Sequence, residues 1–369
     1  MIVVANHIPD LARALGTRYD VVNVPHSDIT NAFLRSCGCT ALFVRTTTRV
    51  TPELLHGTPV QFVGTASAGY DHLDVDYLQK NAIQWTAAPG CNAHAVGEYV
   101  LSCVLKSGIH GSTSGILAEP TTAGTVPKVG IVGYGHTGRA AEKLLRKLGY
   151  DVVIHDPPAL EAGLLSREES MHHRSLIELV STCSVITNHV PLTSIGANAT
   201  AHLFDAAIFE AMLPGTAFIH ASRGGVVDES ALLHAIRNKN IQACIDVWDN
   251  EPEYSVALSR ASIISTPHIA GHSMDAHYVA SAMMLRAYEA FRGGVPEDEI
   301  RVPIGPLRRS IREFTSLQLL SEALENVIDS DSLTRELQKV ETTDPKECGK
   351  HFLRLRMSYT TRREILSME

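Results

Sequence analysis

Four features that would assign a chain to a broad class are missing from this sequence. No apolar run approaches the roughly 18 residues of a membrane-spanning helix, and no basic segment precedes a longer apolar run at the N-terminus, as in a signal peptide. The seven cysteines include no Cys-x-x-Cys pair, and the formal net charge of −8 offers no general attraction for nucleic acids or acidic membranes. These absences predict a cytoplasmic protein with reduced thiols and with no membrane or nucleic-acid partner.

Length and composition predict a folded protein of more than one domain. The chain has 369 residues, which exceeds a typical single domain. Its 44% of hydrophobic and 20% of charged residues are ordinary for a globular protein with a sizeable core. The sequence shows no internal repeat and no low-complexity tract. We therefore expect two or three domains.

The strongest local signal is the glycine motif Gly133-x-Gly135-x-x-Gly138. It follows a short apolar strand and opens a helical pattern, after which a second strand at 151–155 ends at Asp156. This order of strand, glycine turn, helix, strand and acid is the dinucleotide-binding fingerprint. The glycines allow a tight turn and a close approach of the pyrophosphate, whose charge is stabilised by the helix N-terminus.

The acid at the end of the second strand selects between the two nicotinamide cofactors. Asp156 lies where a carboxylate is expected to bind the 2′-hydroxyl of the adenosine ribose, and it would repel the 2′-phosphate of NADP. Pro157 and Pro158 follow it, where an NADP enzyme would have an arginine. The sequence therefore predicts NAD as the cofactor.

The alternation of apolar runs and helical patterns predicts the fold class. We expect an α/β protein in which a doubly wound parallel-sheet (Rossmann) NAD domain, residues 91–272, is inserted in a smaller α/β substrate domain, residues 1–90 and 273–292. The segment 108–127 is rich in Gly, Ser, Thr and Pro and is expected to form a loop, and 293–306 is expected to be a linker.

Residues 300–369 are predicted to form a C-terminal dimerisation domain. Two helical patterns lie at 316–328 and 351–367, and an appended segment of this size usually mediates assembly. We therefore expect a homodimer. The end of the segment carries four arginines that offer an anion or nucleic-acid site, although a solvated helix face is favoured: Arg354, Arg356, Arg362 and Arg363.

Three chemically distinct side chains follow the later predicted strands. Oxidation of a 2-hydroxy acid needs a base that titrates near neutrality, which His268 would supply. A carboxylate on the far ring nitrogen would stabilise the imidazolium, and Glu251 has that predicted role. Arg223 would bind the substrate carboxylate and the developing carbonyl, because its guanidinium is planar and always charged.

The same motif has two histidines at a spacing that is found in metal sites. His268 and His272 are four residues apart, as zinc ligands on a helix are. Pro267 and Gly271 favour a loop there, and no third ligand is evident. No metal is therefore expected.

Taken together, these motifs resemble the D-isomer-specific 2-hydroxyacid dehydrogenases over residues 1 to about 290. The resemblance rests on the glycine motif, Ser222–Gly225, Asp246-Val-Trp…Glu251-Pro and Pro267–Gly271. It implies Arg223, Glu251 and His268 as catalytic residues. It also implies that NAD is held by Gly133, Gly135, His136, Thr137, Gly138, Asp156, Val190, Ala221, Ser222, Arg223, Asp246 and Gly271.

Within the family, several stretches point to a branch that acts on a phosphorylated 2-hydroxy acid. They are Ala88–Ala93 with Val96–Tyr99, Asp156–Pro158, Asp246–Glu253 and the C-terminal domain. The implied substrate contacts are Thr46, Ser67 and His272, where the family usually has Ser, Thr and Tyr.

Charge and position suggest Arg45 and Arg49 as phosphate partners. The alternatives are a phosphoglycerate or glyoxylate/hydroxypyruvate type of dehydrogenase, or a NAD-sensing, corepressor-like binding protein on the same fold. The corepressor-like alternative is disfavoured by the absence of a basic tail.

Overall fold

The protein is described by a computed structural model that covers residues 1–109, 126–295, 300, 301, 303 and 308–368. The chain divides into two compact units, formed by residues 1–92 with 273–305 and by residues 93–272 with 306–369. Most of the predicted loop at 108–127 and of the predicted linker at 293–306 lies outside the described residues. No helix in the described ranges is long and apolar enough to cross a membrane.

The first unit is a five-stranded parallel sheet in the order β2-β1-β3-β4-β5, covered by short helices. The central strands are buried along their whole length, which explains why they are continuous apolar runs in the sequence. Its elements are β1 (Ile2–Ala5), α1 (Leu11–Leu15), β2 (Val21–Val24), the 3-10 helix η1 (His26–Asp28), α2 (Asn31–Ser36), β3 (Ala41–Val44), α3 (Pro52–Leu55), β4 (Phe62–Thr65), α4 (Val75–Lys80), β5 (Gln84–Thr86) and α13 (Met274–Phe291).

Helix α13 returns from the far end of the chain to complete the core of this unit. Tyr288 places its ring edge-on to Phe43 and Phe62, with ring centroids 5.7 and 5.4 Å apart. Phe291 also contacts Phe62, at 5.0 Å. Aromatic contacts of this geometry add to the burial of apolar area. The first unit, which begins with residues 1–92, is therefore completed by a segment that starts only at residue 273.

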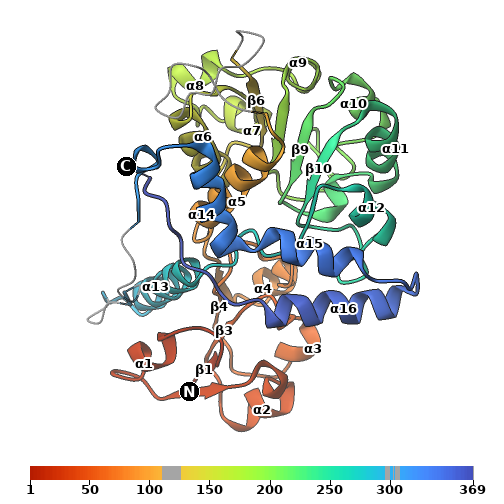
Figure 1. The fold of residues 1–369 in the computed structure, drawn as a ribbon. Coiled ribbons are helices and arrows are strands. Elements are labelled where there is room, and N and C mark those ends of the chain that lie inside the picture. The colour runs from red at the N-terminus through yellow and green to blue at the C-terminus, as the bar shows by residue number, and fades with distance from the viewer. Residues whose placement is uncertain (110–125, 296–299, 302, 304–307, 369) are drawn as a thin grey trace. The chain divides into compact units, whose positions relative to one another are not determined.

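The second unit is a six-stranded parallel sheet in the order β11-β10-β9-β8-β6-β7. The predicted parallel-sheet α/β fold is confirmed (Figure 1). Its elements are α5 (Ala93–Lys106), β6 (Lys128–Val132), α6 (His136–Lys147), β7 (Asp151–His155), α7 (Pro157–Glu161), α8 (Arg167–Met171), α9 (Leu176–Thr182), β8 (Val185–Asn188), α10 (Ala206–Ala211), β9 (Ala217–His220), η2 (Gly224–Val226), α11 (Glu229–Lys239), β10 (Gln242–Ile245), α12 (Val256–Ala261), β11 (Ile264–Ser265), η3 (Ile311–Glu313), α14 (Leu317–Ile328), α15 (Ser330–Gln338) and α16 (Pro345–Ser358).

Strand order in this sheet reverses between β6 and β8. From β6 the chain first adds β7 on one side and then returns to add β8, β9, β10 and β11 on the other. In open α/β sheets, ligands bind beyond the carboxyl ends of the strands at such a switch point. The topology therefore marks one edge of this sheet as the place for a nucleotide.

The C-terminal residues 306–369 group with residues 93–272 and do not form a third unit. Helix α14 packs against α5, while α15 packs against β11 and α12 (Figure 1). The predicted helix at 316–328 corresponds to α14, but the predicted helix at 351–367 is wrong in its limits. Helix α16 begins at Pro345, which follows the side-chain cap of Asp344, and it ends at Ser358 before the extended residue Tyr359. Helix α15 was not predicted.

A buried ion pair anchors the end of the chain to α5. Glu98 is completely buried and forms an ion pair with Arg362. The same carboxylate accepts hydrogen bonds of 2.7 Å from the backbone N–H groups of Ile365 and Leu366. The expected solvated face is therefore wrong for Arg362, which is 5% exposed. Breaking such a pair leaves an uncompensated buried charge, so Glu98 holds the C-terminal tail in place.

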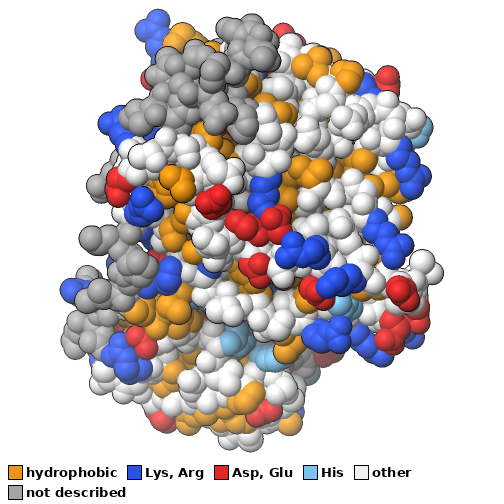
Figure 2. Space-filling model, in the orientation of Figure 1, with side chains coloured by type: hydrophobic (Ala, Val, Ile, Leu, Met, Phe, Trp, Pro, Cys, Tyr) orange, Lys and Arg blue, Asp and Glu red, His pale blue; other side chains and the backbone are white. Residues whose placement is uncertain are grey.

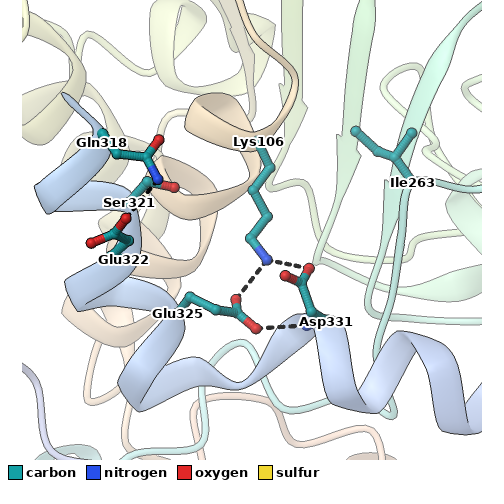
Figure 3. Close-up of a pocket in the computed structure, with 7 residues that line it drawn as sticks. All are labelled: Lys106, Ile263, Gln318, Ser321, Glu322, Glu325 and Asp331. Atoms are coloured by element: carbon teal, nitrogen blue, oxygen red, sulfur yellow. Dashed lines mark hydrogen bonds and ion pairs between the residues drawn. The ribbon is translucent and has the colours of Figure 1, made fainter.

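A second ionic contact lies in a hollow of about 390 Å³ between α5, α14 and α15. Figure 3 shows Lys106 reaching across it to Glu325, at 2.7 Å, and to Asp331. Lys106 is the one cation among the lining residues, and it is already paired with Glu325 and Asp331. The hollow therefore contributes to the packing of helices and is not part of the predicted site. It is lined by Lys106, Ile263, Gln318, Ser321, Glu322, Glu325 and Asp331.

Candidate active site

The predicted catalytic residues follow three neighbouring strands of the second sheet. Arg223 comes after β9, Glu251 after β10 and His268 after β11. These strands are adjacent and parallel, so their carboxyl ends lie at the same edge. The three motifs, which are separate in the sequence, are thereby brought to one edge of the sheet.

Glu251 and His268 form a hydrogen-bonded pair. The Nδ1 atom of His268 lies 2.7 Å from Oε2 of Glu251, as the sequence predicts. The other carboxylate oxygen accepts a 3.0 Å bond from the backbone N–H of Trp248. Burial alone would raise the pKa of Glu251, but His268, the Trp248 N–H and Arg356 together outweigh it, so the pKa is lowered. Glu251 is thus an ionised acceptor that orients the ring of His268 and leaves Nε2 outside this bond.

His268 itself has a left-handed backbone, with φ of 58°. Side chains other than glycine rarely adopt this conformation, and it persists only where surrounding contacts over-determine it. Those contacts come from Asp246, whose carbonyl accepts a 2.8 Å bond from the His268 N–H. The loop at His268 is therefore held against its own backbone preference.

The side chain of Asp246 completes that loop. Its carboxylate accepts bonds from the Thr266 hydroxyl and from the backbone N–H groups of Ile269 and Ala270, at 2.7, 2.7 and 2.9 Å. Burial raises the pKa of Asp246, against the opposing effects of the charge of His268 and of these bonds. Asp246 was predicted as a NAD contact. In the structure its carboxylate bonds are to the loop that carries His268, and contact with NAD stays a prediction.

The Arg223 loop packs directly on the Glu251 loop. A Cβ added to Gly224 would overlap the carbonyl of Trp248, so only glycine permits this approach. Beside it, Asn188 donates a 2.9 Å bond to the Ser222 hydroxyl and lies 3.1 Å from Nδ1 of the buried His220. These contacts join the end of β8 to the end of β9, in the residues that directly precede Arg223.

The glycine motif forms a cradle that fits a pyrophosphate. Gly133 has φ of +87°, and a Cβ there would lie 2.7 Å from the backbone nitrogen of Val190. An added Cβ on Gly135 would meet nothing within 4 Å. Helix α6 begins directly after Gly135 with no side-chain cap, so its first N–H groups, from His136 and Thr137 onward, are available to an anion. The cradle lies at the switch point between β6 and β8.

Asp156 closes the other side of the cradle. Its Oδ2 accepts a 2.7 Å bond from the Tyr134 N–H, and its Oδ1 caps α7 through the N–H of Ala159 at 2.9 Å. Each carboxylate oxygen can accept more than one bond, so these contacts orient Asp156 and leave capacity for a ribose hydroxyl. Of the remaining predicted NAD contacts, Val190, Ala221, Ser222 and Gly271 all lie at the ends of the strands of this sheet.

The predicted substrate residues divide between the two units. Thr46 follows β3 and Ser67 follows β4 at one edge of the first sheet. The Ser67 hydroxyl lies 2.7 Å from that of Thr65 and donates to the Gly69 carbonyl at 2.9 Å. Arg45 lies 2.8 Å from His277.

The third predicted substrate residue, His272, belongs to the second unit. Its ring meets that of Tyr359 edge-on, with centroids 6.0 Å apart. Across the described ranges of the chain, no group of three or more His, Cys, Asp or Glu side chains is placed to hold a metal ion.

Three contacts at this site were missed by the sequence analysis. Tyr99 supports Thr266 through a 2.7 Å hydroxyl bond, and Asn188 and His220 form the buried pair behind Arg223. Arg356 lies 4.0 Å from Glu251. Tyr99 is a polar residue inside an apolar helix, and Asn188 and His220 are polar residues at strand ends, so the sequence held a signal for these contacts. No sequence pattern links Arg356 to Glu251.

The chain is similar to known proteins along most of its length. Residues 119–270 match the family described as D-isomer specific 2-hydroxyacid dehydrogenase, NAD binding domain. An erythronate-4-phosphate dehydrogenase of Stutzerimonas stutzeri is 36% identical over 352 residues, which are 94% of this chain and 88% of that protein. Another from Bacteroides fragilis is 38% identical over 288 residues, 78% of each chain.

A solved structure shares the fold. A D-lactate dehydrogenase from Aquifex aeolicus, complexed with NAD and lactic acid, superposes with a TM-score of 0.62 at 20% identity, covering 79% of this chain and 96% of that chain. The family match and these relatives thus place the chain among the NAD-dependent dehydrogenases of the D-isomer-specific 2-hydroxyacid class, and the predicted cofactor is confirmed. Within that class, the chain belongs to the erythronate-4-phosphate dehydrogenase family.

Replacing Gly224 by alanine is expected to destabilise the protein. The added Cβ overlaps the backbone at Trp248 and Asp249, and overpacking of this kind costs typically about 1 to 3 kcal/mol. Urea unfolding measures the loss. Gly225→Ala is the matched control, because its Cβ would lie 3.3 Å from side-chain atoms of Asp249 and Leu192, which can shift. Equal free energies of unfolding in the two variants would contradict the proposed packing.

Acidification between pH 7 and pH 5 is expected to destabilise the protein partly through His220. Burial lowers the pKa of His220 to about 4, whereas an unfolded histidine titrates near 6.5. The unfolded chain therefore binds the proton first, and stability falls as the pH drops from 6.5 towards 4. The expected loss is roughly 1 to 2 kcal/mol. Urea unfolding of His220→Asn should show a smaller loss over this interval, and an unchanged pH dependence would contradict the assignment.

Proposed function

We propose that this protein oxidises 4-phospho-D-erythronate at C2 to (R)-3-hydroxy-2-oxo-4-phosphooxybutanoate, with NAD as acceptor, in the biosynthesis of pyridoxal 5′-phosphate. The observation that carries the proposal is the bond between Glu251 and His268 at the sheet edge that also bears the cofactor cradle. The names of relatives that match most of the chain support the choice of substrate.

The chemistry divides among three side chains. His268 accepts the C2 hydroxyl proton at Nε2, because Nδ1 is bonded to Glu251. Glu251 keeps the ring oriented and stabilises the imidazolium that forms. Arg223 binds the α-carboxylate and the developing carbonyl oxygen with its paired N–H groups. When bound, NAD supplies the acceptor for the hydride that leaves C2.

Thr46, Ser67 and His272 are proposed to contact the substrate, with Arg45 and Arg49 near its phosphate. The hydroxyls of Thr46 and Ser67 can bond substrate oxygens, and His272 can donate or accept in the place of the tyrosine that is usual in the family. Residues 1–90 with 273–292 would then be the substrate domain, residues 91–272 the NAD domain and residues 300–369 the C-terminal dimerisation domain. The seven free cysteines fit a reducing compartment, and we place the protein in the cytoplasm.

A homodimer assembled through the C-terminal segment is also proposed. Large apolar side chains are exposed on its helices, namely Leu319 at 48%, Leu353 at 44% and Met357 at 83%. Light scattering at micromolar concentration should give twice the chain mass of 40.0 kDa. A monomer that remains fully active would contradict this assembly.

The substrate assignment is tested by following NADH formation from three acids. With an oxo-acid acceptor present to prevent product trapping, 4-phospho-D-erythronate should exceed D-3-phosphoglycerate and D-glycerate at least tenfold in kcat/KM, a difference of about 1.4 kcal/mol. A preference for either smaller acid would agree with a 2-hydroxyacid dehydrogenase but would contradict 4-phospho-D-erythronate as its substrate. NAD binding with no turnover of any acid would favour a binding protein.

His268→Gln supplies the matched variant for that test. Glutamine keeps a polar side chain of similar reach but cannot accept a proton, so kcat should fall at least about 100-fold. NAD affinity, measured by fluorescence, should stay unchanged. Retained activity in this variant would remove His268 from the proposed chemistry.

A further inference from the structure

The last helix of the chain reaches the candidate active site. A Cβ added to Gly349 of α16 would lie 3.4 Å from Pro252 and Glu253, so this helix packs closely on the loop that follows Glu251. One turn on, Phe352 is fully buried and its ring lies 5.9 Å from that of Tyr254. The C-terminal end of α16 is therefore positioned by direct packing on the Glu251 loop.

Arg356 projects from the same helix, one turn beyond Phe352. Its Nη1 lies 4.0 Å from Oε2 of Glu251, the oxygen that also accepts the bond from His268. Tyr359, three residues further, contacts the ring of His272. The end of α16 thus touches both the Glu251–His268 pair and a predicted substrate residue.

The guanidinium of Arg356 has unused bonding capacity. Its distance to Glu251 is beyond hydrogen-bond range, and it makes no hydrogen bond to another described residue. Its side chain is 30% exposed, so a solute can reach it. A guanidinium carries five donors in a planar fork that matches a phosphate. Figure 2 shows that Lys and Arg side chains over α15 and α16 are interspersed with Asp and Glu, so the surface there is not uniformly basic.

We propose that Arg356 contributes to binding the phosphate group of the substrate, in addition to Arg45 and Arg49, which the sequence suggests as phosphate partners. The inference rests on the proposed function, in which the substrate has two anionic ends and Arg223 takes the carboxylate. A second cation beside the Glu251–His268 pair would bind the other end and fix the C2 hydroxyl at His268. Phosphorylated acids would then be selected over unphosphorylated ones, and the C-terminal segment would take part in substrate recognition.

The test compares two substrates that differ only in the phosphate, 4-phospho-D-erythronate and D-erythronate. In Arg356→Gln, kcat/KM for the phosphorylated acid should fall about 10- to 100-fold, mainly through KM, because a charge-assisted bond is lost. The value for D-erythronate should fall much less, because the loss of the Arg356 charge beside Glu251 affects both substrates whereas the loss of a phosphate contact affects only one. The Kd of NAD should stay unchanged. Arg356→Lys, which keeps the charge but not the fork, should recover part of the loss.

Arg354→Gln is the matched control on the same helix. Arg354 is exposed and lies 2.6 Å from His351, so this change should leave both substrates unaffected. An equal fall for both substrates in Arg356→Gln, with a shifted pH profile, would mean that Arg356 acts only through Glu251 and would overturn the proposal. Unchanged kinetics would overturn it as well. Failure of the wild-type enzyme to use the phosphorylated acid would instead count against the proposed function.

Discussion

The buried carboxylate of Asp246 is the contact on which the candidate site depends. It lies directly after β10 and binds the Thr266 hydroxyl and two backbone N–H groups of the next loop. This arrangement holds His268 in a left-handed conformation and presents its ring to Glu251. Because Asp246 is almost fully buried and its bonds are made inside the protein, they are stronger than they would be in water. The position of the His268 ring thus depends on the buried Asp246.

Residues with local signals were predictable from the sequence. The glycine motif and the acid after the second strand define the cradle, because each has a fixed place in one strand–helix–strand unit. Arg223, Glu251 and His268 were predictable because parallel strands bring their ends to one edge, and the bond between Glu251 and His268 is present at 2.7 Å.

Contacts across long sequence separations were not predictable. The ion pair between Glu98 and Arg362 joins residues 264 positions apart. Arg362 was expected on a solvated helix face, but in this pair it is buried. Arg356 lies near Glu251 because Gly349 and Phe352 pack α16 against the loop that follows Glu251. Helical periodicity identifies an apolar stripe, but it does not identify the surface that the stripe will cover. The C-terminal segment, expected as a separate assembly module, groups with the NAD-binding part of the chain.

We propose that His268 and Glu251 serve a direct hydride transfer from C2 of the substrate to NAD. The measurement that tests it most directly uses 4-phospho-D-erythronate deuterated at C2, with mass spectrometry of the reduced cofactor. We expect one deuterium atom in each NADH molecule that is formed. Unlabelled NADH, with the deuterium released to water, would contradict it.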